Sequence, residues 1–150
     1  MNMTNTRQEQ EIDIQLVARL RLAVGRLARR LRQQAEADIS PSGLSALAII
    51  ERGPLTLGEL AARERVRPPS MTRIVAKLEE TGLVSRTPDD QDGRVYRVAL
   101  THEGKQTIQR IRTRKNAYLA KKLRSLSRAD IEALERAVET FERILEEDGS

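Results

Sequence analysis

Apolar residues recur at intervals of three and four near both ends of the chain, which is the spacing of an amphipathic helix. The first of these stripes predicts a helix over 11–35. The last predicts a helix that begins after Ser127, whose spacing to Asp130 is that of a capping box. Its stripe consists of Ile131, Leu134, Val138, Phe141 and Leu145. Because this stripe is too short for an independent coiled coil, the helix needs a larger surface to pack against.

Shorter helices are expected in the middle of the chain, where residues that favour helix starts recur. Ser40 followed by Pro41 predicts an N-cap with proline at the first helical position. Thr56 and Glu59 have capping-box spacing and predict a second short helix over 57–64. Pro68 can open a third helix, which is expected to end at residue 82. The last two helices would be joined by a tight turn.

Two β-strands are expected after these helices, over 83–87 and 95–101, with a polar loop over 88–94 between them. A long helix over 103–126 should follow. Helix, tight turn, helix and then a two-stranded hairpin is the order of elements in a winged helix-turn-helix domain. The predicted fold class is therefore mainly α (α+β), with a two- or three-stranded wing sheet flanked by long N- and C-terminal dimerisation helices.

The helix that starts at Pro68 divides into an apolar face and a polar face. At 100° per residue, Met71, Ile74, Val75 and Leu78 share one face and should belong to the core. The opposite face is small, hydroxylated or cationic near its start, and arginines precede it. Small residues allow close approach to the major groove, and arginine can pair with guanine. This pattern indicates a recognition helix that inserts with its N-terminal half; an ordinary surface helix is the alternative.

The loop over 88–94 would form the wing of such a domain. Arg94, beside Gly93, is expected at its tip, where an arginine can enter the minor groove. The nearby carboxylates of Asp89, Asp90 and Asp92 would oppose DNA binding unless they turn inward to orient an arginine or to close a turn. Their spacing does not match a calcium loop, so we expect no metal site.

Charge is distributed unevenly along the chain. The formal charge is +5, and the 27 basic residues include 22 arginines, whose planar guanidinium groups suit phosphates and guanine edges. Residues 104–129 carry nine basic and no acidic side chains, whereas 130–150 sum to −6. The basic segment could contact DNA, or the two blocks could attract each other within the fold or across a dimer. The sequence leaves both interpretations open.

Several classes of function find little support. Cysteine is absent and His102 is the single histidine, which argues against thiol and zinc chemistry. Glycine-rich phosphate loops and nucleophile-elbow sequences are also missing, so we expect neither an enzyme nor a cofactor. The polar start of the chain and the lack of a membrane-length apolar run predict a cytoplasmic protein without membrane attachment.

The segment from Leu55 to Gly104 resembles the MarR family of bacterial transcription regulators. The most specific parts are PPSMTRIVAKLEETGLVSR and a following pattern of Asp92, Arg94, Leu100, Thr101, Glu103 and Gly104. The resemblance implies a homodimer with intertwined terminal helices that binds a palindromic DNA site. It also implies that Ser70, Thr72, Arg73 and Lys77 face the major groove and Arg94 the minor groove. A small-molecule inducer that weakens DNA binding is a further possible partner.

The predicted division of the chain is a frayed tail over 1–10, helical dimerisation regions over 11–39 and 104–147, and a winged helix-turn-helix DNA-binding domain over 40–103. The residues expected to contact DNA from the recognition helix and the preceding turn are Arg65, Arg67, Pro69, Ser70, Thr72, Arg73 and Lys77. Those expected to contact DNA from the wing are Arg86, Asp92, Gly93 and Arg94. The dimerisation residues are expected to be Ile12, Leu16, Leu20, Leu119, Leu123, Ile131, Leu134, Val138, Phe141 and Leu145.

These features favour a sequence-specific dimeric DNA-binding regulator, with repression as the preferred mode because an occupied operator blocks polymerase. An architectural protein that binds duplex DNA through 104–129 without sequence preference is the main alternative. The two differ in how strongly binding depends on DNA sequence. Packing of the terminal stripes within one monomer remains an alternative to the dimer.

Overall fold

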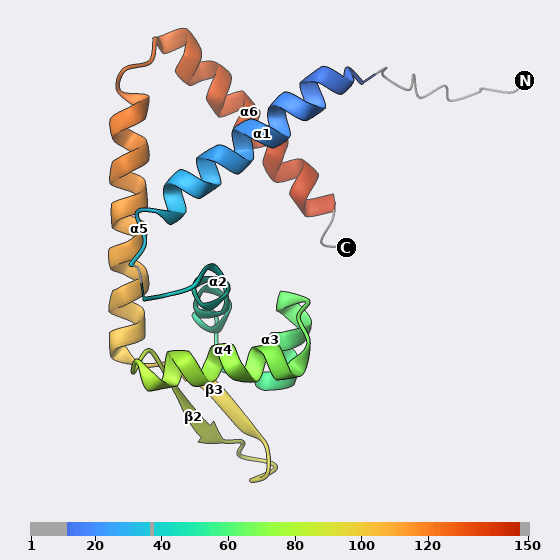
Figure 1. Cartoon of the computed structure of the whole chain (residues 1–150), viewed down its shortest axis with the longest axis vertical. Coiled ribbons are helices and arrows are strands. Elements are labelled where there is room, and N and C mark those ends of the chain that lie inside the picture. The colour runs from blue at the N-terminus through green and yellow to red at the C-terminus, as the bar shows by residue number, and fades with distance from the viewer. Residues whose placement is uncertain (1–11, 37, 148–150) are drawn as a thin grey trace, which may run out of the picture.

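The computed structural model describes residues 12–36 and 38–147, so the expected frayed tail over 1–10 lies outside the described residues. A long upright helix joins a lower lobe of short helices and strands to an upper pair of helices (Figure 1). The elements in chain order are α1 (Ile14–Arg32), α2 (Pro41–Ile50), β1 (Leu55–Thr56), α3 (Leu57–Glu64), α4 (Pro68–Glu80), β2 (Val84–Pro88), β3 (Tyr96–Leu100), α5 (His102–Leu123) and α6 (Arg128–Glu147). This order confirms the predicted winged helix-turn-helix.

The lower part of the molecule, from α2 to β3 (41–100), is called the winged lobe below. Its three strands form an antiparallel sheet in the order β1-β3-β2, with Leu55 opposite Val98 and Val84 opposite Leu100. The core is shared by these strands, the three short helices and the start of α5. Its fully buried large side chains include Leu47, Ile50, Leu60, Met71, Val75, Val98 and Ile111. The winged lobe therefore closes its own hydrophobic core within one chain.

The predicted helix starts of the winged lobe are confirmed by their hydrogen bonds. The Ser40 hydroxyl accepts from the backbone N–H of Gly43 at 3.0 Å. Thr56 and Glu59 form the predicted capping box, with both reciprocal hydrogen bonds at 3.1 Å. Such caps satisfy N–H groups that have no partner inside the helix. These local signals fix where α2 and α3 begin.

The strand boundaries differ from the prediction by one residue at several ends. Leu83 lies before β2, because its N–H donates to the carbonyl of Leu78 and completes the end of α4. Val95 lies before β3, since its N–H donates to the carbonyl of Asp92 in the wing turn. Thr101 caps α5 instead of ending β3. The prediction allowed a third strand in the wing sheet but did not locate it at β1, because this short strand is stabilised by pairing with β3, far along the chain.

Two long helices are shorter than predicted. The helix expected over 11–35 begins at Ile14, capped by Asp13, and ends at Arg32. The helix expected over 103–126 ends at Leu123. In both cases the next residues form backbone hydrogen bonds between residues three apart, which tighten the chain into a turn. Their apolar periodicity continues beyond the helix ends, which is why periodicity alone overestimates the helices.

The junction between the winged lobe and α5 is closely packed. The Thr101 hydroxyl donates to the carbonyl of Gly82 at 2.6 Å and accepts from the N–H of Gly104 at 3.0 Å. A Cβ at Gly104 would overlap the carbonyl oxygen of Leu83. Glycine is therefore required where α5 crosses the end of the α4–β2 connection.

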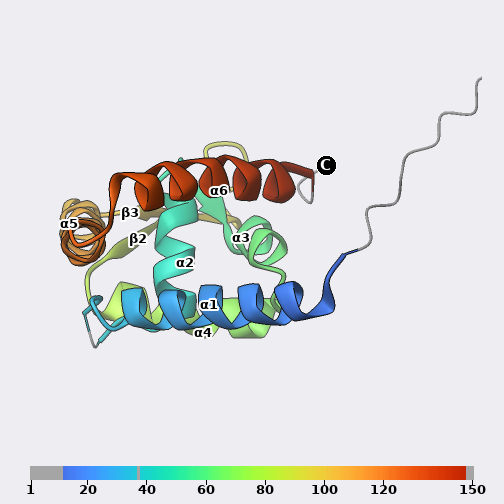
Figure 2. The ribbon, with the colours of Figure 1, turned by 90° about the horizontal axis from the view of Figure 1, so that it is seen from above.

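The terminal helices α1 and α6 are not covered in the same way. α1 has no buried residue, and α6 has none over 128–146. Although they cross in projection in Figure 1, Figure 2 shows them on opposite sides of the molecule. No helix among the described residues is long and apolar enough to cross a membrane. Among the described residues, each terminal helix thus leaves most of its apolar stripe exposed.

Candidate nucleic-acid interface

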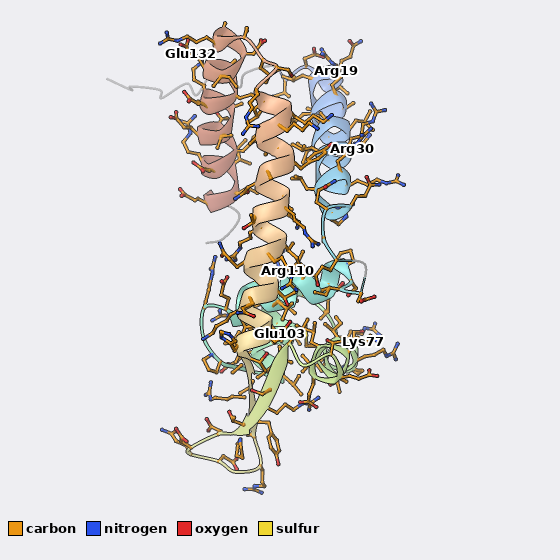
Figure 3. The ribbon with its side chains drawn as sticks, turned by 90° about the vertical axis from the view of Figure 1, so that its left-hand side faces the viewer. Arg19, Arg30, Lys77, Glu103, Arg110 and Glu132 are labelled. Carbon is orange, nitrogen blue, oxygen red and sulfur yellow. The ribbon has the colours of Figure 1, made fainter. Side chains whose placement is uncertain are left out.

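Helix α4 has the two faces that its sequence predicts. Met71, Val75 and Leu78 are buried and Ile74 is half-buried, so this face belongs to the core of the winged lobe. The opposite face is exposed and contains all the predicted recognition residues of the helix, Pro69, Ser70, Thr72, Arg73 and Lys77. Lys77 points away from the body of the molecule in Figure 3. The recognition surface is therefore rigidly supported from behind and open in front.

The turn that leads into α4 exposes two further predicted arginines. Arg65 ends α3 in the left-handed conformation, with φ of 54°, which is uncommon for a residue with a side chain. Arg67 is the N-cap residue of α4 and supplies no capping side-chain hydrogen bond. Because α4 begins with Pro68 and Pro69, which have no N–H group, the attraction of this helix end for a phosphate rests mainly on the two exposed arginines.

Two side chains on α4 also make contacts within their own helix. The Thr72 hydroxyl donates to the carbonyl of Pro68 at 3.0 Å, which leaves its oxygen free to accept and its methyl group exposed. Lys77 lies 3.9 Å from Glu80, in an ion pair whose partners are both largely exposed. Such a pair contributes little to stability and can be exchanged for a phosphate. Neither contact removes the side chain from the exposed surface.

Arg94 is the most accessible cation of the wing. Its side chain is 94% exposed. The backbone N–H of Arg94 donates one hydrogen bond to the Asp92 carboxylate at 3.0 Å, and the Nε atom of Arg94 lies 3.5 Å from the same oxygen. Asp92, which is itself 47% exposed, therefore contacts both the backbone and the side chain of Arg94. A Cβ at Gly93 would meet no atom within 4 Å, so its backbone needs no glycine there.

Arg86 does not share this exposure. Its Nε atom donates to Glu79, near the end of α4, at 3.0 Å, and its side chain is 28% exposed. The guanidinium group is thus paired inside the chain, and the expected contact of Arg86 with DNA stays a prediction. In turn, Arg86 on β2 neutralises part of the negative charge at the end of α4. A DNA contact by Arg86 would require this ion pair to break.

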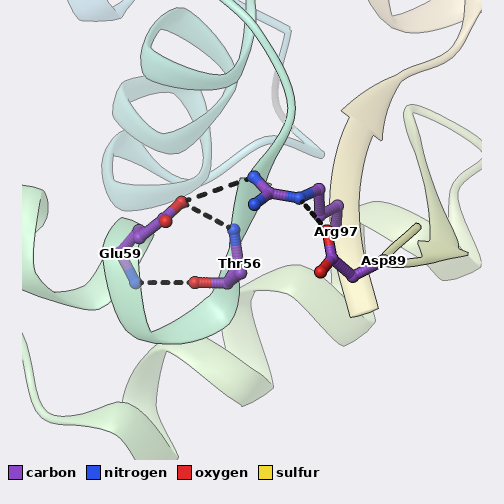
Figure 4. Close-up of polar contacts among 4 residues, drawn as sticks. All are labelled: Thr56, Glu59, Asp89 and Arg97. Carbon is purple, nitrogen blue, oxygen red and sulfur yellow. Dashed lines mark hydrogen bonds and ion pairs between the residues drawn. The ribbon is translucent and has the colours of Figure 1, made fainter. Parts of the chain in front are cut away.

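A second ion-pair group connects the wing to α3 (Figure 4). The Nε atom of Arg97 on β3 donates to Asp89 at 2.7 Å, and its Nη1 atom lies 3.8 Å from Glu59. The hydrogen bond from Arg97 lowers the pKa of the Asp89 carboxyl, and Asp89 raises the pKa of Arg97. From the sequence, Arg97 had no expected role beyond its place in the strand expected over 95–101. The sequence shows that Glu59 and Asp89 are both acidic, but it does not show that one arginine contacts both.

The basic segment over 104–129 contacts the winged lobe and its connection to α1. Arg112 forms a two-bond pair with Glu51 at 2.9 and 2.5 Å, and Arg110 binds Glu36 at 2.6 Å. These hydrogen bonds lower the pKa of both glutamates. Within the described part of the chain, the ion pairs between this segment and the acidic helix are limited to the pair of Arg128 and Glu132, both on α6. Part of the basic block is thus used to hold α5 in place.

The predicted dimerisation residues lie on two separate surfaces. A shallow apolar groove where α5 meets α6 is lined by Leu123, Ile131, Leu134 and Val138. Leu119 and Phe141 are half-buried and Leu145 is exposed. On the other side, Leu16 and Leu20 are exposed on α1, whereas Ile12 precedes the helix. The structure therefore places these side chains in two unpartnered stripes, and does not join them within one chain.

Comparison with known proteins agrees with this architecture. A MarR family model matches residues 39–96. An HTH-type transcriptional regulator of Mycobacterium tuberculosis is 39% identical over 137 residues, which are 90% of this chain and 96% of the relative. The repressor IacR of Pseudomonas putida is 29% identical over 64% of this chain and 58% of its own. A MarR family protein from Bacillus stearothermophilus superimposes with a TM-score of 0.74 at 28% identity, covering 89% of this chain and 98% of that one. The chain therefore belongs to the MarR family of helix-turn-helix transcription regulators.

Proposed function

We propose that this regulator acts in the cytoplasm as a homodimeric repressor at a palindromic operator, and that a small molecule releases it. In this proposal residues 40–103 read DNA, whereas 11–39 and 104–147 form the dimer, and the chain has no enzymatic activity. The observation that carries it is the pair of exposed apolar stripes on α1 and α6. A second copy of the chain is the simplest surface that covers both.

The size of these stripes supports a dimer. Large exposed apolar patches are rare on monomers and usually mark an interface. Ile14 is 82% exposed, and many apolar side chains of both helices are at least two-fifths exposed. On α1 these include Leu16, Val17, Leu20, Leu22, Val24 and Leu27, and on α6 they include Leu134, Val138, Ile144 and Leu145. Covering them would contribute about 25 cal/mol for each Å² of apolar surface removed from water.

The charges beside the stripes favour contact between α1 of one protomer and α6 of the other. Arg19, Arg26 and Arg30 lie along one edge of the α1 stripe, and Arg19 and Arg30 point outward in Figure 3. Glutamates lie along one edge of the α6 stripe at 135, 142 and 146. Pairing α1 with α1, or α6 with α6, would bring like charges together. Two-fold symmetry would make both α1–α6 contacts identical.

The exposed face of α4 supports sequence-specific binding. We propose that Arg73 reads a base edge in the major groove, because its long side chain projects from the N-terminal half of the recognition helix. The other side chains that we propose to face the major groove are those of Pro69, Ser70, Thr72 and Lys77. Arg65 and Arg67, in the preceding turn, would contact phosphates. Arg94, on the extended wing, would enter the minor groove and add affinity with less base discrimination.

Release by a small molecule would act on the connection between the winged lobe and the dimerisation helices. A groove of about 550 Å³ on α5 is lined by Gln106, Gln109, Arg110, Thr113 and Arg114. Arg110 there binds Glu36, which lies between α1 and α2. A ligand in this groove would compete with that ion pair and loosen the connection. The groove therefore supports the proposal of a ligand without identifying one.

The first test is selection of bound duplexes from a random DNA pool at physiological salt. A specific dimer should enrich a palindrome whose half-sites lie about 34 Å apart, one turn of B-DNA. Salt-sensitive binding without an enriched sequence would instead identify an architectural protein that recognises only the phosphate backbone. Light scattering of the same protein would report the dimer independently of DNA.

The selected duplex then allows the roles of two arginines to be compared. We expect Arg73→Ala to cost about 1–3 kcal/mol against the preferred sequence and to remove discrimination at one base pair. We expect Arg94→Ala to weaken binding to different sequences more evenly. Competition binding at fixed salt measures both effects, with Arg29→Ala on the exposed surface of α1 as the control. Unchanged specificity in the Arg73 variant would contradict the assignment.

A further inference from the structure

Arg97 occupies a central position between the wing and the helix-turn-helix. It lies on β3, directly opposite Thr56 of β1 in the sheet. Its guanidinium group binds Asp89, the first residue after β2, at 2.7 Å through Nε. On its other side Nη1 lies 3.8 Å from Glu59 of α3. One side chain therefore spans from the root of the wing to the first helix of the helix-turn-helix pair.

The α3 end of this connection is itself fixed. The Glu59 carboxylate oxygen that faces Arg97 also accepts a hydrogen bond from the backbone N–H of Thr56 at 3.1 Å. This bond is half of the capping box that starts α3, whose side chains pack in the core. Arg97 is thus attached to a rigid helix end (Figure 4), and not to a freely moving carboxylate.

The wing end is closed by Asp89. The backbone N–H of Asp89 donates to the carbonyl of Val95 at 2.7 Å, which joins the two sides of the loop at its root. The Asp89 side chain is 19% exposed and turns inward to Arg97. Arg94 lies within the loop that this pair closes, one residue before Val95. Movement of the Asp89–Arg97 pair would therefore carry Arg94 with it.

We propose that Arg97 is a positioning residue for DNA binding, which fixes the wing against α3 and so sets the place at which Arg94 meets the duplex. This inference rests on the proposed contact of Arg94 with DNA. Arg86 and Glu79 hold β2 to α4 on the other side of the hairpin, so each strand of the wing is attached to a different helix. Without the Arg97 contact, the hairpin would be free to pivot about the remaining contact between Arg86 and Glu79.

Direct contact of Arg97 with a phosphate is the competing explanation, since its side chain is 38% exposed. The two explanations make opposite predictions for Asp89→Asn. If Arg97 positions the wing, this variant weakens the Asp89–Arg97 pair and lowers DNA affinity. If Arg97 binds phosphate, the variant releases a cation and leaves affinity equal or higher. Whether Asp89→Asn lowers or raises DNA affinity therefore distinguishes a positioning role of Arg97 from direct contact with a phosphate.

The experiment measures affinity of the full chain for the selected duplex by fluorescence anisotropy. We expect Arg97→Gln and Asp89→Asn each to weaken binding about five- to tenfold, the lower part of the range for loss of an arginine contact. In an Arg94→Ala background the same substitutions should weaken binding by less than about twofold, because residues that act through one contact are not additive. Urea unfolding should show that the variants remain folded.

Arg128→Gln is the control, because it breaks an arginine–glutamate pair on α6, away from the wing and from the junction between the winged lobe and α5. It should leave affinity unchanged. Full additivity of Arg97→Gln with Arg94→Ala, or tighter binding by Asp89→Asn, would overturn the inference while leaving the proposed role of Arg94 intact. If Arg94→Ala alone had no effect, the proposed DNA contact would be wrong and the inference would fall with it.

Discussion

The winged lobe and the terminal helices have similar apolar periodicity but very different burial. In the winged lobe the apolar positions of α2, α3 and α4 meet one another, the sheet and the start of α5. In α1 and α6 the same kind of stripe has no buried side chain over the described residues up to 146. Periodicity therefore tells which face of a helix must be covered, but not whether the covering surface belongs to the same chain.

This difference has a physical basis in how the elements are connected. The short turns of the winged lobe bring its helices together, and loops of this kind cost little entropy to close. The terminal helices instead lie away from the lobe, with α6 at the far end of α5 and α1 extending from beside α5 (Figure 1). A stripe on such a helix can be covered by a second molecule with the same exposed surfaces. In the proposed dimer, the winged lobe would fold on its own core and the terminal helices would provide the association surface.

The largest effect is expected from placing charge in the α6 stripe. Leu134→Asp together with Val138→Asp should abolish the dimer at micromolar concentration, since an unpaired buried carboxylate costs about 3–5 kcal/mol. The winged lobe, which has its own core, should keep its helical structure. Light scattering measures the mass and circular dichroism the helix content.

Ala133→Asp together with Thr140→Asp is the matched control. It adds the same charge to exposed positions of α6 outside the stripe. This variant should remain dimeric. A dimer that survives the Leu134 and Val138 substitutions would show that the α6 stripe is not the interface.

Replacing glycine by alanine is expected to have a smaller effect on the free energy of unfolding, with opposite signs at the start of α5 and on α1. Gly104→Ala should lower the free energy of unfolding by at least about 2 kcal/mol, because the added methyl group would overlap the Leu83 carbonyl. Gly25→Ala, on α1, should raise it by about 0.5–1 kcal/mol, because alanine favours a helix and a Cβ there meets no atom within 4 Å. Urea unfolding measures both. Equal effects of the two substitutions would contradict the close packing of the α5 junction.

The smallest effect concerns the ion pairs that join the two regions. Arg112 lowers the pKa of Glu51, so the folded protein favours the ionised carboxylate. The stabilising contribution is therefore complete above the usual pKa and is lost as pH falls through the lowered value. Wild-type protein should be slightly more stable than Glu51→Gln at neutral pH, and the difference should disappear in acid. Urea unfolding midpoints of the two proteins, measured from neutral to acid pH, test this expectation. A stability difference that grows in acid would show that the pKa of Glu51 is shifted in the opposite direction.

Local signals in the sequence predicted the winged lobe well. The Ser40 cap and the Thr56–Glu59 capping box act within a few residues, so their spacing alone located α2 and α3. The buried face of α4 also followed from its spacing, and the structure exposes the predicted recognition side chains on the other face. That these exposed side chains contact DNA stays a prediction.

The contacts that sequence reasoning missed all join distant segments. Arg97 and Glu59 meet because β3 lies beside β1, a strand too short to be recognised before its partner is known. Arg86 was expected on DNA, but the fold places Glu79 beside it. Neither pairing leaves a periodic or capping signal. The charges were visible in the sequence, but their partners were not.

The sequence by itself determined the starts of α2, α3 and α4, the two faces of α4, the hairpin and the family, because these depend on spacing within short segments. Only the tertiary structure decided which arginines are engaged by carboxylates, why Gly104 cannot carry a side chain, and which stripes stay uncovered. The reason is that an ion pair or a close approach depends on how separate segments meet in space. That meeting is set by the packing of the whole chain.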